Sequence, residues 1–357
     1  MAVRRILYGI ILPCGEGYYR DIITKKPSRA ERENCKNSRD MLYSIQIDAP
    51  GRKGENGMLE MAENRVRRPF CGGKLLDEFM GICPGVDGNY PERWICSATR
   101  SVDGEGISRT KDGRLLTDLY REPVNVLVKL LDSCTRLMIQ VHPDDARAQK
   151  YFGSRFGKAE CWYILDTRIV DGQEPYVFIG FKEGITREKW EALYRAQDIA
   201  GMEACLHKIP VKKGDAFFIP GGLVHAMGSG VFFAEIQQPT DITLRVERIS
   251  PDGREMDDKG LHGGAGEAAL FDCFDYTGCR EEEILEQYKL FRRGDTVVDN
   301  ELFRMRDVAA PEPYLVRVKG YAIVLVLEGK NQGKEYFLTE DTLFPGGQRL
   351  LICDSKQ

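Results

Sequence analysis

Four side chains have the types and spacing of a divalent-metal site: Gln140, His142, Glu160 and His225. Gln140 and His142 lie two positions apart in an apolar run, so on a strand both project from the same face. Glu160 opens a second apolar run, where an ionised carboxylate without a partner is energetically unfavourable. His225 follows a third apolar run and its Pro-Gly-Gly turn. One amide, one carboxylate and two imidazoles form an N/O ligand set that transition metals accept.

Histidine in an apolar segment has a commoner explanation than metal binding. A single buried His more often makes hydrogen bonds within a protein core. This chain, however, has only four His among 357 residues, and His142 and His225 both lie at the ends of apolar segments near oxygen-bearing side chains. His207 and His262 have no such neighbours, and we expect them to be structural.

The segments that must position these residues alternate apolar and polar side chains, which predicts a mainly β protein. A strand-rich run from about 66 to 180 is typical of one half of a jelly-roll barrel. Apolar residues at helical spacing, among them Trp190 and Tyr194, predict a small helical insertion at about 184–208 with Thr186 as its N-cap.

These patterns divide the chain into four parts. We expect a catalytic cupin domain at 58–250, followed at 251–294 by a connecting segment whose Gly- and Asp-rich start predicts a loop. Strand-like alternation returns at 295–357 and predicts a second, degenerate cupin-like domain, which contains no His. For residues 1–57 we expect a disordered extension or a mis-assigned start, with native translation beginning at Met58.

The motifs around the candidate ligands resemble class I mannose-6-phosphate isomerase in its short bacterial form. In chain order they are GGKLLD at 72–77, ERWICSA at 92–98, VLVKLLD at 126–132, QVHPDD at 140–145, GKAECWY at 157–163, KGDAFFIP at 213–220 with His225 and Ala226, EIQQ at 235–238 and DITLR at 241–245. The resemblance covers about 65–350 and is densest over 115–248. Several motifs in one order are far more specific than any one of them.

This resemblance implies a cupin fold with one zinc ion held by Gln140, His142, Glu160 and His225. It also implies reversible conversion of mannose 6-phosphate into fructose 6-phosphate, in which a proton moves between C1 and C2 through an enediol. Zinc suits this chemistry because it is a redox-inert Lewis acid that polarises the sugar oxygens.

The resemblance points to four further residues near the substrate. Lys158, two positions before a candidate ligand, would lie on the same side of an extended segment and contact the sugar or move a proton. Arg245 has a guanidinium suited to a phosphate or a developing enediolate. Glu235 and Asp241 would orient a substrate hydroxyl or act as the base. Both are weaker candidates for a catalytic role than Lys158 and Arg245. Taken alone, Lys158 would be a solvated residue beside a turn, and Arg245 a surface residue paired with Asp241 or Glu247.

Two positions depart from the family pattern. Met138 stands where many relatives carry a Ser credited with helping phosphate or sugar binding. Arg248 lies near the position where longer members have a Lys. An arginine keeps the positive charge, but it titrates too high to act as a base. The phosphate contacts of this chain therefore cannot be carried over from the family.

Two other functions stay open at the level of sequence. His142, Glu160 and His225 alone also match the two-His, one-carboxylate set of non-haem iron oxygenases. A catalytically silent cupin that binds a sugar phosphate would carry the same ligands. Gln140, as a fourth ligand, and the two nearby cations favour the isomerase.

Composition is that of an ordinary soluble enzyme. Hydrophobic residues make up 42% of the chain, and the net charge of −4 comes without a basic patch, which argues against nucleic acid or anionic membranes as partners. No apolar run approaches the ~20 residues that span a bilayer. Eleven Cys without a CxxC pair are typical of reduced cytosolic thiols. We expect a cytoplasmic monomer or homodimer that acts on a sugar phosphate.

Overall fold

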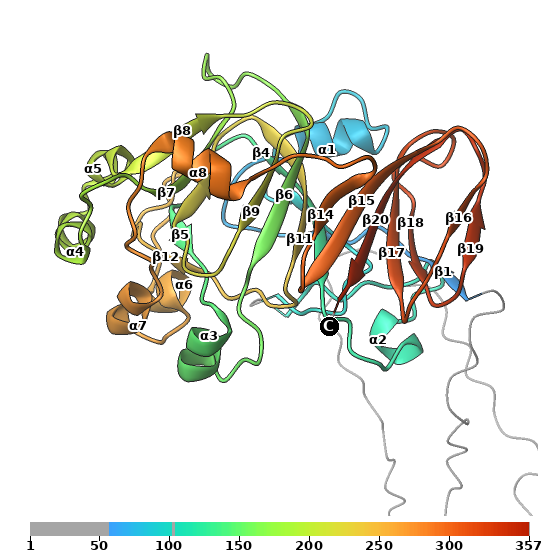
Figure 1. Ribbon diagram of the computed structural model, residues 1–357, viewed down its shortest axis with the longest axis horizontal. Helices are drawn as coiled ribbons and strands as arrows, with labels where there is room; N and C mark the ends of the chain where they lie inside the picture. The colour runs from blue at the N-terminus through green and yellow to red at the C-terminus, as the bar shows by residue number, and fades with distance from the viewer. Residues whose placement is uncertain (1–56, 102–103, 357) are drawn as a thin grey trace, which may run out of the picture. The chain divides into compact units, whose positions relative to one another are not determined.

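The computed structural model describes residues 57–101 and 104–356, which belong to one compact unit (Figure 1). The extension expected at 1–57 lies, apart from Gly57, outside the described residues. Among the helices within these ranges, none is long and apolar enough to cross a membrane.

Two antiparallel sheets form the barrel that carries the candidate site (Figure 1). The seven-stranded sheet contains, in spatial order, β13 (Lys289–Leu290), β9 (Ala216–Ile219), β6 (Glu160–Thr167), β11 (Val231–Gln237), β4 (Leu127–Ser133), β3 (Glu92–Ile95) and β2 (Arg65–Val66). The five-stranded sheet contains β12 (Leu244–Arg245), β5 (Gln140–Val141), β10 (His225–Met227), β7 (Tyr176–Phe181) and β8 (Leu206–Pro210). Apolar side chains from both sheets share one core, as a jelly roll requires.

Strand β6 shows how alternation decides which side chains face the barrel interior. Trp162 and Ile164 pack into the core between the two barrel sheets. Cys161 and Tyr163 pack into a different core, on the opposite face. Because successive side chains of a strand point to opposite faces, Glu160 shares the interior face with Trp162.

A third sheet packs on the outer face of the seven-stranded sheet, through a continuous apolar core. It contains, in spatial order, β1 (Met58–Glu60), β18 (Glu335–Leu338), β17 (Ala322–Glu328), β20 (Gln348–Ser355), β15 (Phe303–Ala310) and β14 (Thr296–Asp299). A two-stranded sheet joins β16 (Tyr314–Val316) to β19 (Thr342–Phe344). Met58 pairs with Leu338, so the strand at 58–60 lies with the C-terminal strands and not in the barrel. That 295–357 is a separate cupin-like domain stays a prediction.

The helical insertion connects β7 to β8 and contains α4 (Arg187–Ala196) and α5 (Ile199–Ala204). The predicted cap is confirmed, because Thr186 Oγ1 accepts a hydrogen bond from Lys189 N at 3.3 Å. Trp190 and Tyr194 are buried, as their spacing predicted.

In the part of the chain that the structure describes, six further helices lie outside this insertion: α1 (Lys74–Phe79), α2 (Leu116–Leu119), α3 (Asp145–Phe152), α6 (Asp258–His262), α7 (Glu267–Asp272) and α8 (Glu281–Tyr288). The expected strand-rich run at 66–180 contains β3 to β7 and also the unpredicted helices α1, α2 and α3, and the expected loop in the connecting segment was wrong at α6. The caps of α3 and α6 show why these two were not predicted. Both helices begin after an Asp whose side chain accepts a backbone N–H, Asp144 from Arg147 and Asp257 from Gly260. A short segment that begins with an Asp cap has the same residue types as a turn, so its sequence favours a turn as much as a helix.

Candidate active site

Three adjacent strands bring Arg245, Gln140 and His225 into one row. Strand β5 lies between β12 and β10, and Gln140 pairs with Arg245 on one side and with His225 on the other. Directly paired residues project from the same face of a sheet, so all three side chains point into the barrel. His225 opens β10 immediately after the turn that carries the chain from β9 in one sheet to β10 in the other.

The four predicted ligands converge. His142 Nε2 lies 3.4 Å from Glu160 Oε2, and His225 Nε2 lies 3.5 Å from Glu160 Oε1. One ligand atom from each of these three residues lies within 4.8 Å of the others, and all three side chains are buried. The Gln140 side-chain amide is 3.2 Å from His225 Nε2. Because an amide can present either its nitrogen or its oxygen by rotation, Gln140 can supply an oxygen ligand at the same point.

Backbone carbonyls fix the tautomers of both imidazoles. His142 Nδ1 lies 2.9 Å from Ile242 O, and His225 Nδ1 lies 2.8 Å from Leu223 O. A carbonyl only accepts, so each Nδ1 donates and each Nε2 is left as an acceptor that faces Glu160. Burial, with Lys158 adding to it, lowers the pKa of His142 to about 3, and burial also lowers the pKa of His225. Both rings are therefore neutral, the form that binds a metal.

Glu160 is 1% exposed, yet it is ionised. Burial alone would raise the pKa of this carboxyl, but the Lys158 ammonium outweighs burial and holds the pKa well below its ordinary value. Trp162 Nε1 donates to Glu160 Oε1 at 2.9 Å, and Lys158 Nζ lies 2.9 Å from both Glu160 Oε2 and His142 Nε2. Lys158 thus lies on the same side as Glu160, as predicted.

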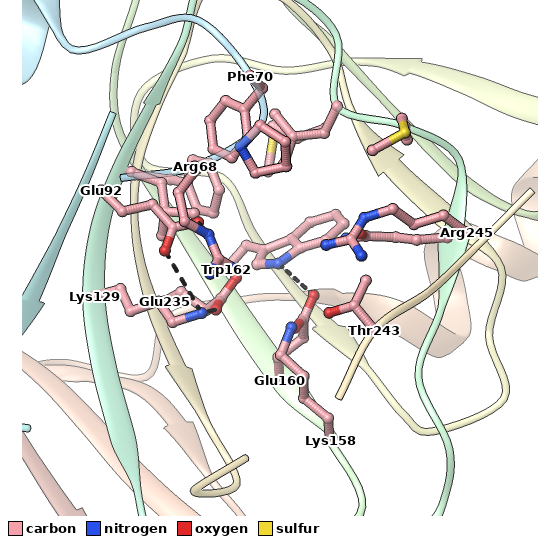
Figure 2. Close-up of a pocket in the computed structure, with 17 residues that line it drawn as sticks. Arg68, Phe70, Glu92, Lys129, Lys158, Glu160, Trp162, Glu235, Thr243 and Arg245 are labelled. Carbon is pink, nitrogen blue, oxygen red and sulfur yellow. Dashed lines mark hydrogen bonds and ion pairs between the residues drawn. The ribbon is translucent and has the colours of Figure 1, made fainter. Parts of the chain in front are cut away.

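A second group of buried charges lines another side of the pocket (Figure 2). Arg68 donates from its two terminal nitrogens to Asp241 at 3.0 and 2.9 Å and from Nε to Glu92 at 3.0 Å. Lys129 Nζ lies 3.3 Å from Glu235 Oε1. Sequence reasoning found the two later carboxylates but missed Arg68, Glu92 and Lys129. The available signal was a charged side chain inside an apolar strand, as at Lys129 in VLVKLLD.

The two predicted carboxylates differ in their electrostatics. Burial would raise the pKa of Asp241, but the paired Arg68 outweighs it and holds this pKa below its usual range. Burial and the nearby Glu160 raise the pKa of Glu235, and Lys129 only partly offsets them. Asp241 is therefore a permanently charged partner of Arg68, whereas Glu235 is the pocket carboxylate that gains a proton more readily.

Arg245 reaches the pocket without a carboxylate partner among the described residues. Its terminal nitrogen donates to Gly260 O at 2.8 Å. The alternative partner Glu247 instead pairs with Arg136 at 2.7 Å. Burial, with repulsion from Arg68 adding to it, lowers the pKa of Arg245 to about 10. A guanidinium held in this way is available to an anionic ligand.

The pocket combines these charges with an apolar wall. Its polar lining is Arg68, Glu92, Lys129, Gln140, Lys158, Glu160, Glu235, Thr243 and Arg245, and its apolar lining is Pro69, Phe70, Leu131, Leu137, Met138, Trp162, Met227 and Phe233. Figure 2 shows Phe70 at one end, Glu160 and Lys158 at the other, and Arg245 opposite Lys129. Asp241 is not part of this lining, but it accepts from Arg68, which is.

Arg248, His207 and His262 belong neither to this lining nor to the predicted ligand cluster. Arg248 bonds to Tyr194 Oη at 3.0 Å and to Glu267 at 2.9 Å. His207 Nε2 lies 2.9 Å from Cys279 O, and His262 Nδ1 accepts from Gly266 N at 3.0 Å. That these two His are structural stays a prediction.

Comparison with known proteins gives no match to a family model. A mannose-6-phosphate isomerase of Streptococcus mutans is 38% identical over 224 residues, which are 56% of this chain and 64% of that protein. A probable mannose-6-phosphate isomerase of Bacillus subtilis is 38% identical over 198 residues, which are 50% of this chain and 57% of that protein. The predicted resemblance is confirmed. The chain spans less than two thirds of the length of either relative.

Solved structures of mannose-6-phosphate isomerases share the fold. The enzyme from Bacillus subtilis matches with a TM-score of 0.65 and 22% identity, over 84% of this chain and 99% of that one. A zinc-bound mannose 6-phosphate isomerase matches with a TM-score of 0.60 and 14% identity, over 84% of this chain and 100% of that one. The mainly β, cupin-type fold expected from the sequence is therefore confirmed.

Proposed function

We propose that this chain is a zinc-dependent aldose–ketose isomerase that interconverts mannose 6-phosphate and fructose 6-phosphate. The observation that carries this proposal is the buried cluster of His142, Glu160 and His225, joined by Gln140, at the wall of a pocket that Gln140, Glu160 and Arg245 line. The names of the similar proteins favour the isomerase over an oxygenase or a silent binding protein.

We assign the metal to Gln140, His142, Glu160 and His225. The chemistry of this donor set supports zinc, because two neutral imidazoles with inward Nε2 atoms and one ionised carboxylate are its common protein ligands. The fourth ligand, Gln140, exceeds the three-residue set of non-haem iron oxygenases. When bound, zinc would supply Lewis acidity at the sugar oxygens on C1 and C2.

Two cations would bind the substrate and stabilise developing charge. Arg245 lacks an ion-pair partner among the described residues, so its fork-shaped guanidinium suits a phosphate or the enediolate oxygen. Lys158 lies against two ligand atoms and would donate to a sugar oxygen at that end of the pocket.

Glu235 is the carboxylate best suited to move a proton. Its raised pKa brings it closer to the working pH, where an acid or base is most effective. Asp241 would act indirectly, because it holds Arg68, which in turn contacts Glu92 in the wall of the pocket. A cytoplasmic location agrees with the nine described Cys, all of which are free thiols. A monomer or homodimer remains our proposal for the assembly.

The deciding experiment incubates zinc-loaded protein with mannose 6-phosphate and measures fructose 6-phosphate in an enzyme-linked assay. A chelator-treated sample and a sample reloaded with zinc run beside it. Turnover that the chelator removes and zinc restores supports the proposal. Metal-loaded, folded protein that forms no fructose 6-phosphate refutes it, and oxygen uptake with Fe(II) would point to an oxygenase instead.

A further inference from the structure

Two half-exposed cysteines, Cys71 and Cys134, lie side by side behind one wall of the pocket. Cys71 O accepts a hydrogen bond from Cys134 N at 2.9 Å, and Thr135 Oγ1 accepts one from Cys71 N at 3.3 Å. The two thiol side chains are themselves within hydrogen-bonding contact. The described residues therefore hold two neighbouring cysteines that are partly exposed to solvent.

The backbone on both sides of this pair is held in place. A Cβ on Gly72 would lie 1.8 Å from Asp132 O, so only glycine permits this approach of the 71–73 turn to β4. Asp132 Oδ2 accepts from Gly73 N at 2.9 Å and from Leu75 N at 2.8 Å. Because a disulfide requires two cysteines that already lie close together, a bond between these thiols needs little movement of the main chain.

We propose that Cys71 and Cys134 form a redox-active dithiol, which a hydroperoxide oxidises to an intramolecular disulfide and a thiol reductant restores. The thiolate of one cysteine attacks the peroxide O–O bond, so one oxygen stays on its sulfur as a sulfenic acid and the other leaves as water or an alcohol. The sulfur of the second cysteine then attacks the oxidised sulfur. The S–O bond breaks, and the hydroxyl leaves as water with the proton from the second thiol. Two electrons pass from the two sulfurs to the peroxide.

The disulfide would fasten one wall of the pocket to the seven-stranded sheet. Cys71 directly follows Phe70 and lies three residues after Arg68, both of which line the pocket. Cys134 directly follows β4, which carries Lys129. Closing the long loop between the two cysteines restricts the unfolded chain, so the oxidised protein should unfold at a higher temperature than the reduced one.

The test treats full-length, zinc-loaded protein with hydrogen peroxide, blocks the remaining thiols with an alkylating reagent and digests with trypsin. Cys71, Cys134 and Cys83 fall in three separate tryptic peptides, at 68–74, 130–136 and 75–93, each with one Cys. We expect the first and second peptides to be joined, with the loss of two hydrogen masses, and reductant to separate them. The melting temperature should rise with the disulfide and return on reduction.

Matched variants make the outcome decisive. Cys71→Ser and Cys134→Ser should lose both the cross-linked peptide and the rise in melting temperature, whereas Cys83→Ser, at an exposed cysteine, should keep both. If peroxide oxidises Cys83 while Cys71 and Cys134 remain open to alkylation, the proposal is overturned. A cross-link that joins other cysteines overturns it as well. Neither readout depends on isomerase activity, so this proposal and the proposed function can fail separately.

Discussion

Replacing Arg245 with Met should nearly abolish turnover while leaving the fold as stable as before. The substitution keeps the apolar stem and removes a half-buried charge from the pocket. Arg245 has no carboxylate partner among the described residues, so its removal leaves no buried anion unpaired. We expect turnover to fall by ~100-fold or more, the scale measured when one group that stabilises a developing anion is lost.

The expected stability follows from two opposing contributions. The pKa of about 10 for Arg245 means that the fold disfavours its charged form. At about 1.4 kcal/mol for each pKa unit, this amounts to roughly 3 kcal/mol that the substitution relieves. The lost hydrogen bond to Gly260 O is a charged one and contributes about 1.5–3 kcal/mol in the other direction. The two nearly cancel, so we expect a free energy of unfolding within about 1.5 kcal/mol of the wild type.

Two other arginines supply the contrast. Arg68→Met leaves Asp241 and Glu92 buried without their shared partner and should destabilise the fold by about 3–5 kcal/mol. Arg248→Met removes a half-exposed residue outside the pocket and should change the free energy of unfolding by less than about 1 kcal/mol, with turnover unchanged. Urea unfolding and the enzyme-linked assay measure both quantities on all three variants. Full turnover in Arg245→Met, or instability equal to that of Arg68→Met, would refute the reasoning.

Three further changes test other parts of the site. Glu160→Gln should lose zinc on dialysis, as measured by metal content per chain, while His207→Gln should retain it. Trp162→Phe removes the N–H that donates to Glu160 Oε1 and should weaken zinc affinity by about 10- to 100-fold in a competition titration. Trp190→Phe is its control, since this indole N–H has no partner among the described residues. Asp241→Asn tests the pH dependence of stability. Because the fold lowers the pKa of Asp241, the wild-type carboxylate stabilises the fold above the ordinary Asp pKa of about 4, and this stabilisation is lost as the pH falls below that value. Urea unfolding at neutral and acidic pH should show the wild-type advantage shrinking in acid, and an advantage that persists there contradicts the assignment.

The sequence by itself determined which side chains can bind a metal and on which side of a strand they lie. The two-residue spacing of Gln140 and His142, and of Lys158 and Glu160, follows the strand period, so shared faces could be predicted without a structure. The spacing at Thr186, Trp190 and Tyr194 likewise predicted a capped helix. These features are local, and the physics that decides them lies within a few residues.

The short helices α3 and α6 were missed for a related local reason. Their Asp caps and Gly residues are equally typical of turns, and only the packing of the segment decides between helix and turn. The strand at Met58 could not be placed either, since its partner Leu338 lies at the other end of the chain.

Only the tertiary structure decided which distant residues share the site. Arg68, Glu92 and Lys129 meet Glu235 and Asp241 because strands far apart in sequence pair or pack together. Burial would raise the pKa of both carboxyls. The fold places Arg68 beside Asp241 and so lowers the pKa of Asp241, whereas the pKa of Glu235 stays raised. Residue type and spacing specify the ligands, but desolvation and long-range pairing depend on the folded chain as a whole.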